Sequence, residues 1–447
     1  MARFTSVTTL LLASWCASVA GAQPINEDTT YFPAPTLQGA YGTTVDVFGD
    51  FMIVGAPSDN ENDVLAGAAY LVDLVSGTQI KLNPIDVDGG DQFGFSVAIG
   101  SDYAIVGAPF DRDLGFENGA VYIFEVPSGT LLHTIRGNPT SEFGYDVDID
   151  GSIAIIGARE QGSGGEAYLY NAMSGSLLFT LPVQSAFGFD EFGHGVSIDD
   201  SAGIACVGAP GEFIPGVDAR IGAVHLFDLS NGAHLRTLTP PLDRSSEFGA
   251  CVDIRDSLVL VGAPKAPDFL SDTGAGYLFD SASGALLRTF LIDDSPSPTQ
   301  FNMLGFSAKL GDGVALLGAP EWDFQGTSET FNNGAGFLFD TSSGGLLARF
   351  EPVGATLGDR NGSGVGISGS TIAIGTPGDD YPGGFGAGSV SIYSYELPCA
   401  PDLNMDGNLD FFDINELLQS GVDYNGDTQF DFFDISAFLQ DLALGCP

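Results

Sequence analysis

The residues best suited to chemistry form an acidic loop near the C-terminal end of the sequence. Oxygen-bearing side chains stand at positions 1, 3, 5, 9 and 12 of the twelve residues that begin at Asp402, with Gly407 at position 6. A hard cation such as Ca²⁺ takes six to eight oxygen ligands, and this spacing wraps carboxylates, an amide and the backbone carbonyl of position 7 around one point. The loop therefore predicts a calcium site with the ligands Asp402, Asn404, Asp406, Asn408, Asp410 and Asp413.

The same pattern returns 21 residues later and predicts a second calcium site. Its ligands are Asp423, Asn425, Asp427, Gln429, Asp431 and Asp434. Position 6 of this loop is Thr428 instead of glycine. A β-branched residue is strained in the left-handed backbone conformation that the turn requires, so we expect the second site to be weaker or distorted.

A short amphipathic helix is expected after each loop, because apolar residues recur there at helical spacing. These residues are Ile414, Leu417 and Leu418 after the first loop and Ile435, Phe438, Leu439 and Leu442 after the second. Paired calcium loops with aspartate at position 12, each followed by one helix, resemble a dockerin module, a small α-helical domain that would span residues 398–447. The resemblance implies a cohesin-like partner and a place in extracellular, often polysaccharide-degrading, assemblies. Dockerins commonly recognise that partner through positions 10 and 11, which are here Phe411-Phe412 and Phe432-Phe433 and could instead form the core of the module.

Cysteine usage is consistent with export. Cys16 lies in the N-terminal segment described below, which leaves four cysteines in the remaining chain. Cys399 and Cys446 bracket the acidic tail and are expected to form a disulfide. Cys206 and Cys251 occupy repeated strand positions, where a disulfide and two buried thiols are equally compatible with the sequence.

Seven internal repeats precede the tail and set the architecture. The phrase Val-Gly-Ala-Pro or a close variant recurs with its glycine at Gly55, Gly107, Gly157, Gly208, Gly262, Gly318 and Gly375. An aromatic-Gly pair or a degenerate equivalent precedes each phrase, with its glycine at Gly42, Gly94, Gly144, Gly193, Gly249, Gly305 and Gly362. The two glycines are 13 residues apart in six repeats and 15 apart in the fourth, so the register of the repeat is tight.

Each repeat predicts four short antiparallel strands. In the second repeat they are expected at residues 95–99, 103–106, 119–124 and 130–135, with a Ser-Gly turn before the last. Seven such units predict an all-β, seven-bladed β-propeller over residues 23–397. The seventh unit lacks a fourth strand, and we expect residues 29–32 to supply it and close the ring. The alternative is an N-terminal leader with no place in the sheet.

The repeats resemble FG-GAP repeats, the units of the integrin alpha-subunit propeller and of many secreted bacterial propellers. Calcium-carrying FG-GAP units place an Asp-rich loop of about a dozen residues between the first two strands. Here a tight turn such as Gly100-Ser101-Asp102 takes that place, and the 13-residue spacing leaves no room for the longer loop. The integrin-type calcium sites are therefore not expected in these blades.

The loops after each Gly-Ala-Pro should emerge on one face of the disc, because they hold the same place in every blade. They gather aromatic residues suited to stacking on a sugar or a protein loop: Phe110, Phe213, Phe269, Trp322, Phe324 and Tyr381. Acidic residues accompany them: Asp111, Asp113, Glu212, Asp268, Glu321, Asp323, Asp379 and Asp380. For any single ring, the alternative is that it caps its own blade.

Residues 1–22 have the features of a secretory signal peptide: a short positive start at Arg3, an apolar stretch and the small residues Ala20-Gly21-Ala22. No later apolar run is long enough to span a bilayer, so a secreted or surface-associated protein is expected. The chain carries 58 Asp and Glu against 14 Lys and Arg, a formal net charge of −44. A negative field of this size argues against nucleic acid and anionic membrane surfaces as partners.

Motifs for catalysis are scarce. His133 and His234 fall on outer strands, where a histidine is usually structural, and neither a nucleophile elbow nor a phosphate loop is present. The favoured hypothesis is a secreted, non-catalytic binding or scaffold protein. Its propeller face would bind a glycan or protein ligand, and its calcium-loaded tail would attach it to a cohesin-like protein or to a cell-surface or extracellular scaffold. One alternative is a carbohydrate-active enzyme with a propeller domain: a glycosidase, for which acid pairs are available, or a polysaccharide lyase, whose typical cluster of His, Tyr and Arg is not found in the sequence. The other alternative is a cell-adhesion protein.

Overall fold

The computed structural model describes residues 24–25, 27–33, 39–82, 84–182, 188–214, 220–241, 246–268, 271–292, 302–322, 332–352, 356, 358–380 and 386–395. The chain divides into two compact units, Met1–Tyr393 and Ser394–Pro447. Residues 1–22, both calcium loops, their helices and the Cys399/Cys446 pair lie outside the described residues, so these expectations remain predictions.

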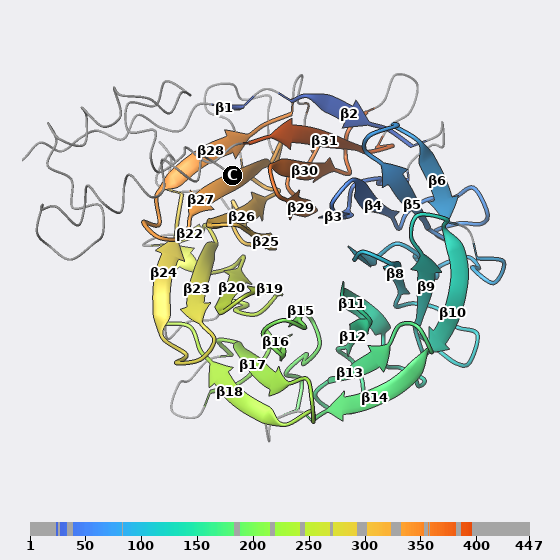
Figure 1. The fold of residues 1–447 in the computed structure, drawn as a ribbon, viewed down its shortest axis with the longest axis horizontal. Helices are drawn as coiled ribbons and strands as arrows, with labels where there is room; N and C mark the ends of the chain where they lie inside the picture. Colours follow the sequence, from blue (N-terminus) through green and yellow to red (C-terminus); the bar gives the residue numbers. More distant parts are fainter. Residues whose placement is uncertain are drawn as a thin grey trace, which may run out of the picture. The chain divides into compact units, whose positions relative to one another are not determined.

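The first unit is a ring of seven small β-sheets (Figure 1). Residues at or near the inner strands of all seven blades line a central channel. Blade 1 contains β3 (Thr44–Phe48), β4 (Phe51–Ala56), β5 (Ala68–Asp73) and β6 (Gln79–Leu82), and blade 2 contains β7 (Ser96–Ile99), β8 (Tyr103–Ala108), β9 (Ala120–Glu125) and β10 (Thr130–Arg136). Blade 3 contains β11 (Phe143–Asp150), β12 (Ile153–Ala158), β13 (Glu166–Asn171) and β14 (Ser176–Leu181), and blade 4 contains β15 (Val196–Asp199), β16 (Ile204–Ala209), β17 (Ala223–Asp228) and β18 (His234–Leu238).

Blade 5 contains β19 (Cys251–Arg255), β20 (Leu258–Ala263), β23 (Ala275–Asp280) and β24 (Leu286–Phe290), with a small hairpin of β21 (Pro267–Asp268) and β22 (Ser271–Asp272) between its second and third strands. Blade 6 contains β25 (Ser307–Gly311), β26 (Val314–Ala319), β27 (Ala335–Asp340) and β28 (Leu346–Phe350), and blade 7 contains β29 (Val365–Ser368), β30 (Thr371–Thr376) and β31 (Ser389–Ser394). The all-β, seven-bladed propeller predicted from the repeats is confirmed, and the described residues contain no helix.

The N-terminal segment closes the ring. β2 (Thr29–Tyr31) pairs antiparallel with β31 and gives blade 7 its fourth strand, so this prediction is confirmed. The amide of Asp28 donates to the Ile392 carbonyl at 2.8 Å, and Ser391 Oγ donates to Glu27 at 2.9 Å. β1 (Pro24–Ile25) adds in parallel to the outer edge of β28, a fifth strand of blade 6 that the repeats do not predict. We call residues 24–33 the N-terminal clasp.

The two recurring glycines meet across every junction between blades. Gly107 belongs to the Gly-Ala-Pro phrase of blade 2, and Gly144 belongs to the aromatic-Gly pair of blade 3. A Cβ added to Gly107 would lie 2.2 Å from the carbonyl oxygen of Gly144. At the closing junction the same contact joins Gly375 of blade 7 to Gly42 of blade 1, at 1.9 Å. The second strand of one blade therefore approaches the start of the inner strand of the next at backbone distance, because both positions lack a side chain.

In five of the seven repeats the residue before this glycine is aromatic, and it is buried in a core cluster that two neighbouring blades share. Phe93, for example, is 1% exposed and packs edge-on against Tyr122 with ring centroids 5.2 Å apart. The connections between first and second strands are two to four residues long, such as Gly49-Asp50, which confirms the expected tight turns. Cys206 and Cys251 are free thiols, which settles the choice that the sequence left open. No helix within the described ranges is long and apolar enough to cross a membrane.

Candidate functional site at the mouth of the central channel

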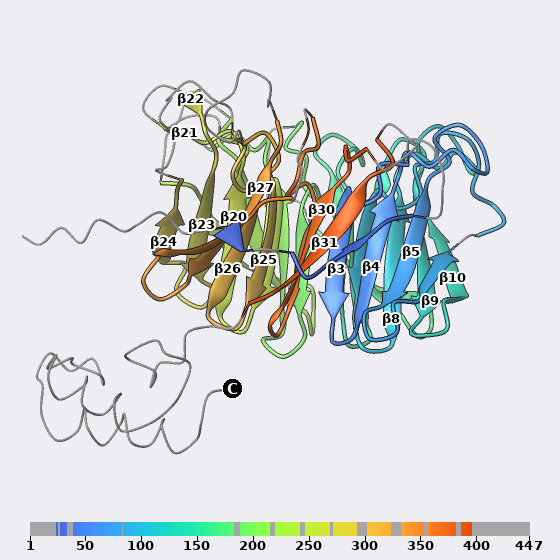
Figure 2. The same ribbon diagram turned by 90° about the horizontal axis from the view of Figure 1, so that it is seen from above.

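The channel opens on the face that carries the loops after Gly-Ala-Pro. In blade 1, Thr44 at the start of β3 pairs with Gly55 near the end of β4, so the inner strand begins where the Gly-Ala-Pro loop leaves. The same antiparallel register recurs in the other blades, for example between Ser96 and Gly107. Figure 2 shows this loop face at its upper edge, where the β21–β22 hairpin stands. The loops therefore surround the channel mouth.

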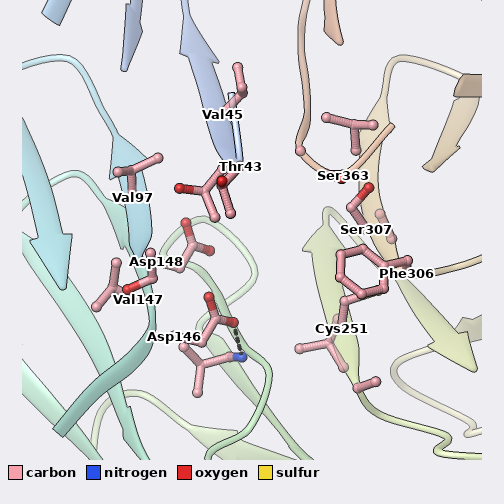
Figure 3. A pocket seen from close by; sticks show the side chains of 18 of the residues that line it. Thr43, Val45, Val97, Asp146, Val147, Asp148, Cys251, Phe306, Ser307 and Ser363 are labelled. Atoms are coloured by element: carbon pink, nitrogen blue, oxygen red, sulfur yellow. Dashed lines mark hydrogen bonds between the residues drawn. The ribbon is translucent and has the colours of Figure 1, made fainter. Parts of the chain in front are cut away.

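A cavity of about 240 Å³ lies at this mouth and is lined by all seven inner strands or the residues that precede them (Figure 3). One residue from each blade forms its outer ring: Thr43, Phe95, Tyr145, His194, Ala250, Phe306 and Ser363. The cavity is smaller than pockets that enclose a drug-sized molecule, so it would hold only one small group of a larger ligand.

Aromatic rings form an arc along one side of the mouth. Phe110, from the loop after β8, packs edge-on against Phe95 with centroids 5.7 Å apart. Phe95 contacts Tyr145 at 5.0 Å, and Tyr145 contacts His194 at 4.9 Å. Phe306, from blade 6, is 38% exposed. Such half-buried rings offer flat apolar surface with their edges still accessible to a ligand.

Two polar groups fix this arc. The Arg159 guanidinium lies over the Tyr145 ring, 3.8 Å from its centroid, and donates to Glu142 Oε2 at 2.7 Å. His194 Nδ1 is 2.9 Å from the Ala250 carbonyl oxygen, which can only accept, so Nδ1 carries the proton. Burial, with the nearby Arg159 charge, lowers the pKa of His194 to about 4. His194 is therefore neutral at neutral pH, and its Nε2 is an acceptor.

The floor of the cavity is acidic. Asp146 and Asp148 lie two residues apart on β11 and point into the channel (Figure 3). Asp146 accepts the amide of Val196 at 2.7 Å, and burial raises the pKa of Asp146 to about 7. Lys309 of blade 6 lines the same cavity. These residues were not predicted from the sequence, although the alternation of polar and apolar residues in an inner strand is a signal that could have indicated them.

Of the six predicted ligand-face residues, some lie in the loops of the loop face, one lies in the core, and three are not described by the structure. Phe110 lies in the aromatic arc. Phe213 forms an isolated antiparallel β-bridge with Arg220 in the loop of blade 4. Trp322 is only 5% exposed and packs against Phe337 in the core, so its ring is not offered to a ligand. Phe269, Phe324 and Tyr381 lie outside the described residues.

The best-placed loop acids serve their own blades. Asp111 is fully buried beside the hydroxyl of Tyr122, which donates to it at 3.4 Å. Glu212 is 2.6 Å from Nε2 of the buried His225. On the outer strands, His133 Nε2 lies 3.0 Å from the Met173 carbonyl and His234 contacts Thr237, both structural positions. Within the described ranges, no group of three or more His, Cys, Asp or Glu side chains is arranged to hold a metal ion.

Comparison with known proteins supports the repeat assignment. The family model of the FG-GAP repeat matches residues 39–72 and 77–124, which cover β3, β4 and most of β5, and β6 to most of β9. Mouse integrin alpha-E is 32% identical over 143 residues, which cover 26% of this chain and 11% of the integrin. The chain thus spans about a tenth of the length of this curated relative.

Fold and repeats together define the class: a seven-bladed propeller that carries FG-GAP repeats and is similar to a segment of an integrin alpha chain. The similarity to an integrin alpha chain is compatible with an extracellular or surface location.

Proposed function

We propose that this chain is a secreted, non-catalytic binding protein. Its propeller holds a ligand at the mouth of the central channel, and a calcium-loaded, dockerin-like tail attaches it to a cohesin-like protein or an extracellular scaffold. The observation that supports the first half is the arc of Phe110, Phe95, Tyr145 and His194 beside an open cavity, on a face formed by loops from every blade.

The chemistry of the mouth favours an uncharged, hydroxyl-bearing group or a small protein side chain. Tyr145 and Phe306 supply flat apolar surface, and the neutral His194 supplies an acceptor. Arg159 is already paired with Glu142, so it does not supply an unshared positive charge for an anion. A polysaccharide strand or a protein loop that inserts one such group fits these features.

Binding to a panel of neutral and acidic polysaccharides tests this half. For a polysaccharide that binds, Phe306→Ala and Tyr145→Ala should each weaken binding about tenfold or more, because a buried aromatic anchor commonly contributes at least that much. Phe48→Ala is the matched control, because Phe48 is 46% exposed at the opposite end of β3. Binding that is unchanged in both mouth variants would place the ligand elsewhere. Release of reducing ends or unsaturated products would instead support the enzyme alternative.

The attachment half rests on the doubled calcium loops of the sequence. Titration of the full chain with Ca²⁺ should give two bound ions, the tighter in the loop that begins at Asp402 and the weaker in the loop with Thr428. Asp402→Ala should abolish the tighter site and Asp423→Ala the weaker one. Asp102→Ala, on an exposed turn of the propeller, should leave both sites unchanged. If neither loop variant alters the titration, the calcium assignment is wrong.

A further inference from the structure

Below the mouth, the inner strands bring four carboxyl groups and one ammonium group together in the channel. Lys309 Nζ of blade 6 lies 3.1 Å from Asp46 Oδ1 of blade 1 and 3.7 Å from Asp253 Oδ1 of blade 5. Asp46 and Asp253 are 6% and 7% exposed. Asp146 and Asp148 of blade 3 line the same channel. A single lysine charge therefore faces four acids.

Each of these acids also fastens its blade to the next. Asp46 accepts the amide of Ile99 in blade 2 at 2.9 Å, and Asp253 accepts that of Leu310 in blade 6 at 2.7 Å. Asp146 and Asp148 accept the amides of Val196 and Ile198 in blade 4, at 2.7 and 2.9 Å. The charged cluster is thus part of three blade junctions. A change in the charge of its carboxyl groups therefore affects the hydrogen bonds that join neighbouring blades.

Four ionised carboxylates beside one ammonium would leave excess negative charge in a site where Asp46 and Asp253 are buried and Asp146 and Asp148 are half-buried. Buried groups escape this cost by binding protons. Burial, together with the neighbouring carboxylates, raises the pKa of Asp146 and of Asp253 to about 7. Burial also raises the pKa of Asp46, even though Lys309 opposes the shift.

The other charged and titratable groups around the cluster do not compensate its excess of acidic over basic groups. Asp150 on β11 and Asp199 on β15 add negative charge, and burial raises the pKa of Asp150. The thiols of Cys206 and Cys251 have raised pKa values and stay neutral. His194 at the mouth is neutral because its pKa is lowered to about 4.

We propose that this cluster is a pH-sensitive lock across the blade junctions of the propeller. In mildly acidic solution two of its carboxyl groups are protonated and Lys309 balances much of the remaining negative charge, so the propeller is more stable than at higher pH. As the pH rises, the two carboxyl groups ionise and repulsion within the channel grows. The free energy of unfolding of the propeller therefore decreases. The lock acts on the propeller itself and does not depend on the proposed ligand or on the tail.

The sign of the effect follows from linkage. The folded chain keeps protons on Asp146 and Asp253 that the unfolded chain, with ordinary carboxyl pKa values of 3.8, has already lost. Their contribution to stability is therefore fully present below pH 3.8 and is lost as the pH rises through about 7. Between these values the folded state binds more protons than the unfolded state, so stability falls as pH increases.

Thermal unfolding of the full chain from pH 5 to pH 8.5, at fixed ionic strength and fixed Ca²⁺, tests the lock. The Tm of the wild type should fall by several degrees across this range, and Asp146→Asn with Asp253→Asn should flatten the profile. Asp50→Asn is the control, because Asp50 is an exposed acid on a turn between strands and should leave the profile unchanged. A wild-type profile no steeper than that of the double variant would overturn the proposal.

A direct proton measurement keeps the test decisive if the double variant does not fold. At pH 6 the wild type should release about two protons on unfolding through Asp146 and Asp253. Infrared difference spectra of the folded chain should also show protonated carboxylic acid at pH 6 that disappears by pH 8.5. Absence of both signals would show that the channel carboxyl groups are already ionised and that no lock exists.

Discussion

Replacing Lys309 with methionine should destabilise the propeller by about 3–5 kcal/mol at pH 8. The methionine fills a similar volume, so the loss is electrostatic. Asp46 and Asp253 would keep their backbone amide partners but lose the ammonium group that lies 3.1 and 3.7 Å from them. Their desolvation would then be uncompensated. Chemical denaturation followed by circular dichroism measures the change in the free energy of unfolding.

Two comparisons separate this effect from a general loss of charge. Lys265→Met removes a lysine that is 53% exposed and paired with Glu247 at 2.6 Å, and exposed pairs contribute about 1 kcal/mol or less. The cost of Lys309→Met should also shrink at pH 5, where the channel carboxyl groups take up protons. A loss at pH 8 no larger than that of Lys265→Met would contradict the central role of Lys309.

Removal of the N-terminal clasp should have a comparable effect on the whole ring. Without residues 24–33, β31 loses its outer neighbour and presents unpaired backbone groups at an open edge, which favours association with other chains. The bonds from Asp28 and Ser391 are lost, and so is the packing of Tyr31 against the core of blades 1 and 7. At about 1 kcal/mol for each lost hydrogen bond, the total is several kcal/mol. A chain that begins at residue 34 should unfold at lower temperature and aggregate, compared with one that begins at residue 23.

Complementation tests the mechanism behind this loss. A synthetic peptide of residues 24–33, added to the truncated chain, should restore its Tm in a concentration-dependent manner. The same peptide with Asp28→Pro cannot donate to the Ile392 carbonyl and should restore less. If the truncated chain is as stable as the longer one, the clasp does not close the propeller.

The architecture was predictable because its physical cause repeats along the chain. Contacts such as that of Gly107 with Gly144 demand glycine at fixed places in each blade, so the spacing of glycines reports the number of blades. The missing fourth strand of blade 7 was visible as an incomplete repeat, and residues 29–31 fill it. The parallel addition of β1 to β28 involves only Pro24 and Ile25, too short a segment to carry a strand pattern.

The site was less accessible to sequence reasoning, because it depends on which residues face the channel. Asp46, Asp148 and Lys309 come from separate repeats, and only the closed ring brings them together. An aromatic residue in a loop can equally cover its own blade or face a ligand. Trp322 and Phe110 lie in corresponding loops of two repeats. Trp322 nevertheless packs in the core, whereas Phe110 lies at the channel mouth.

The order of strands in blade 7 also has a mechanical consequence. The chain leaves the propeller through β31, so tension transmitted from the residues that follow Ser394 acts first on this strand. β31 lies between β30 and β2, and it is therefore bonded along both edges. Extracting it would require the two rows of backbone bonds to fail together. The segment that completes the ring thus also reinforces the one strand on which an external load would act.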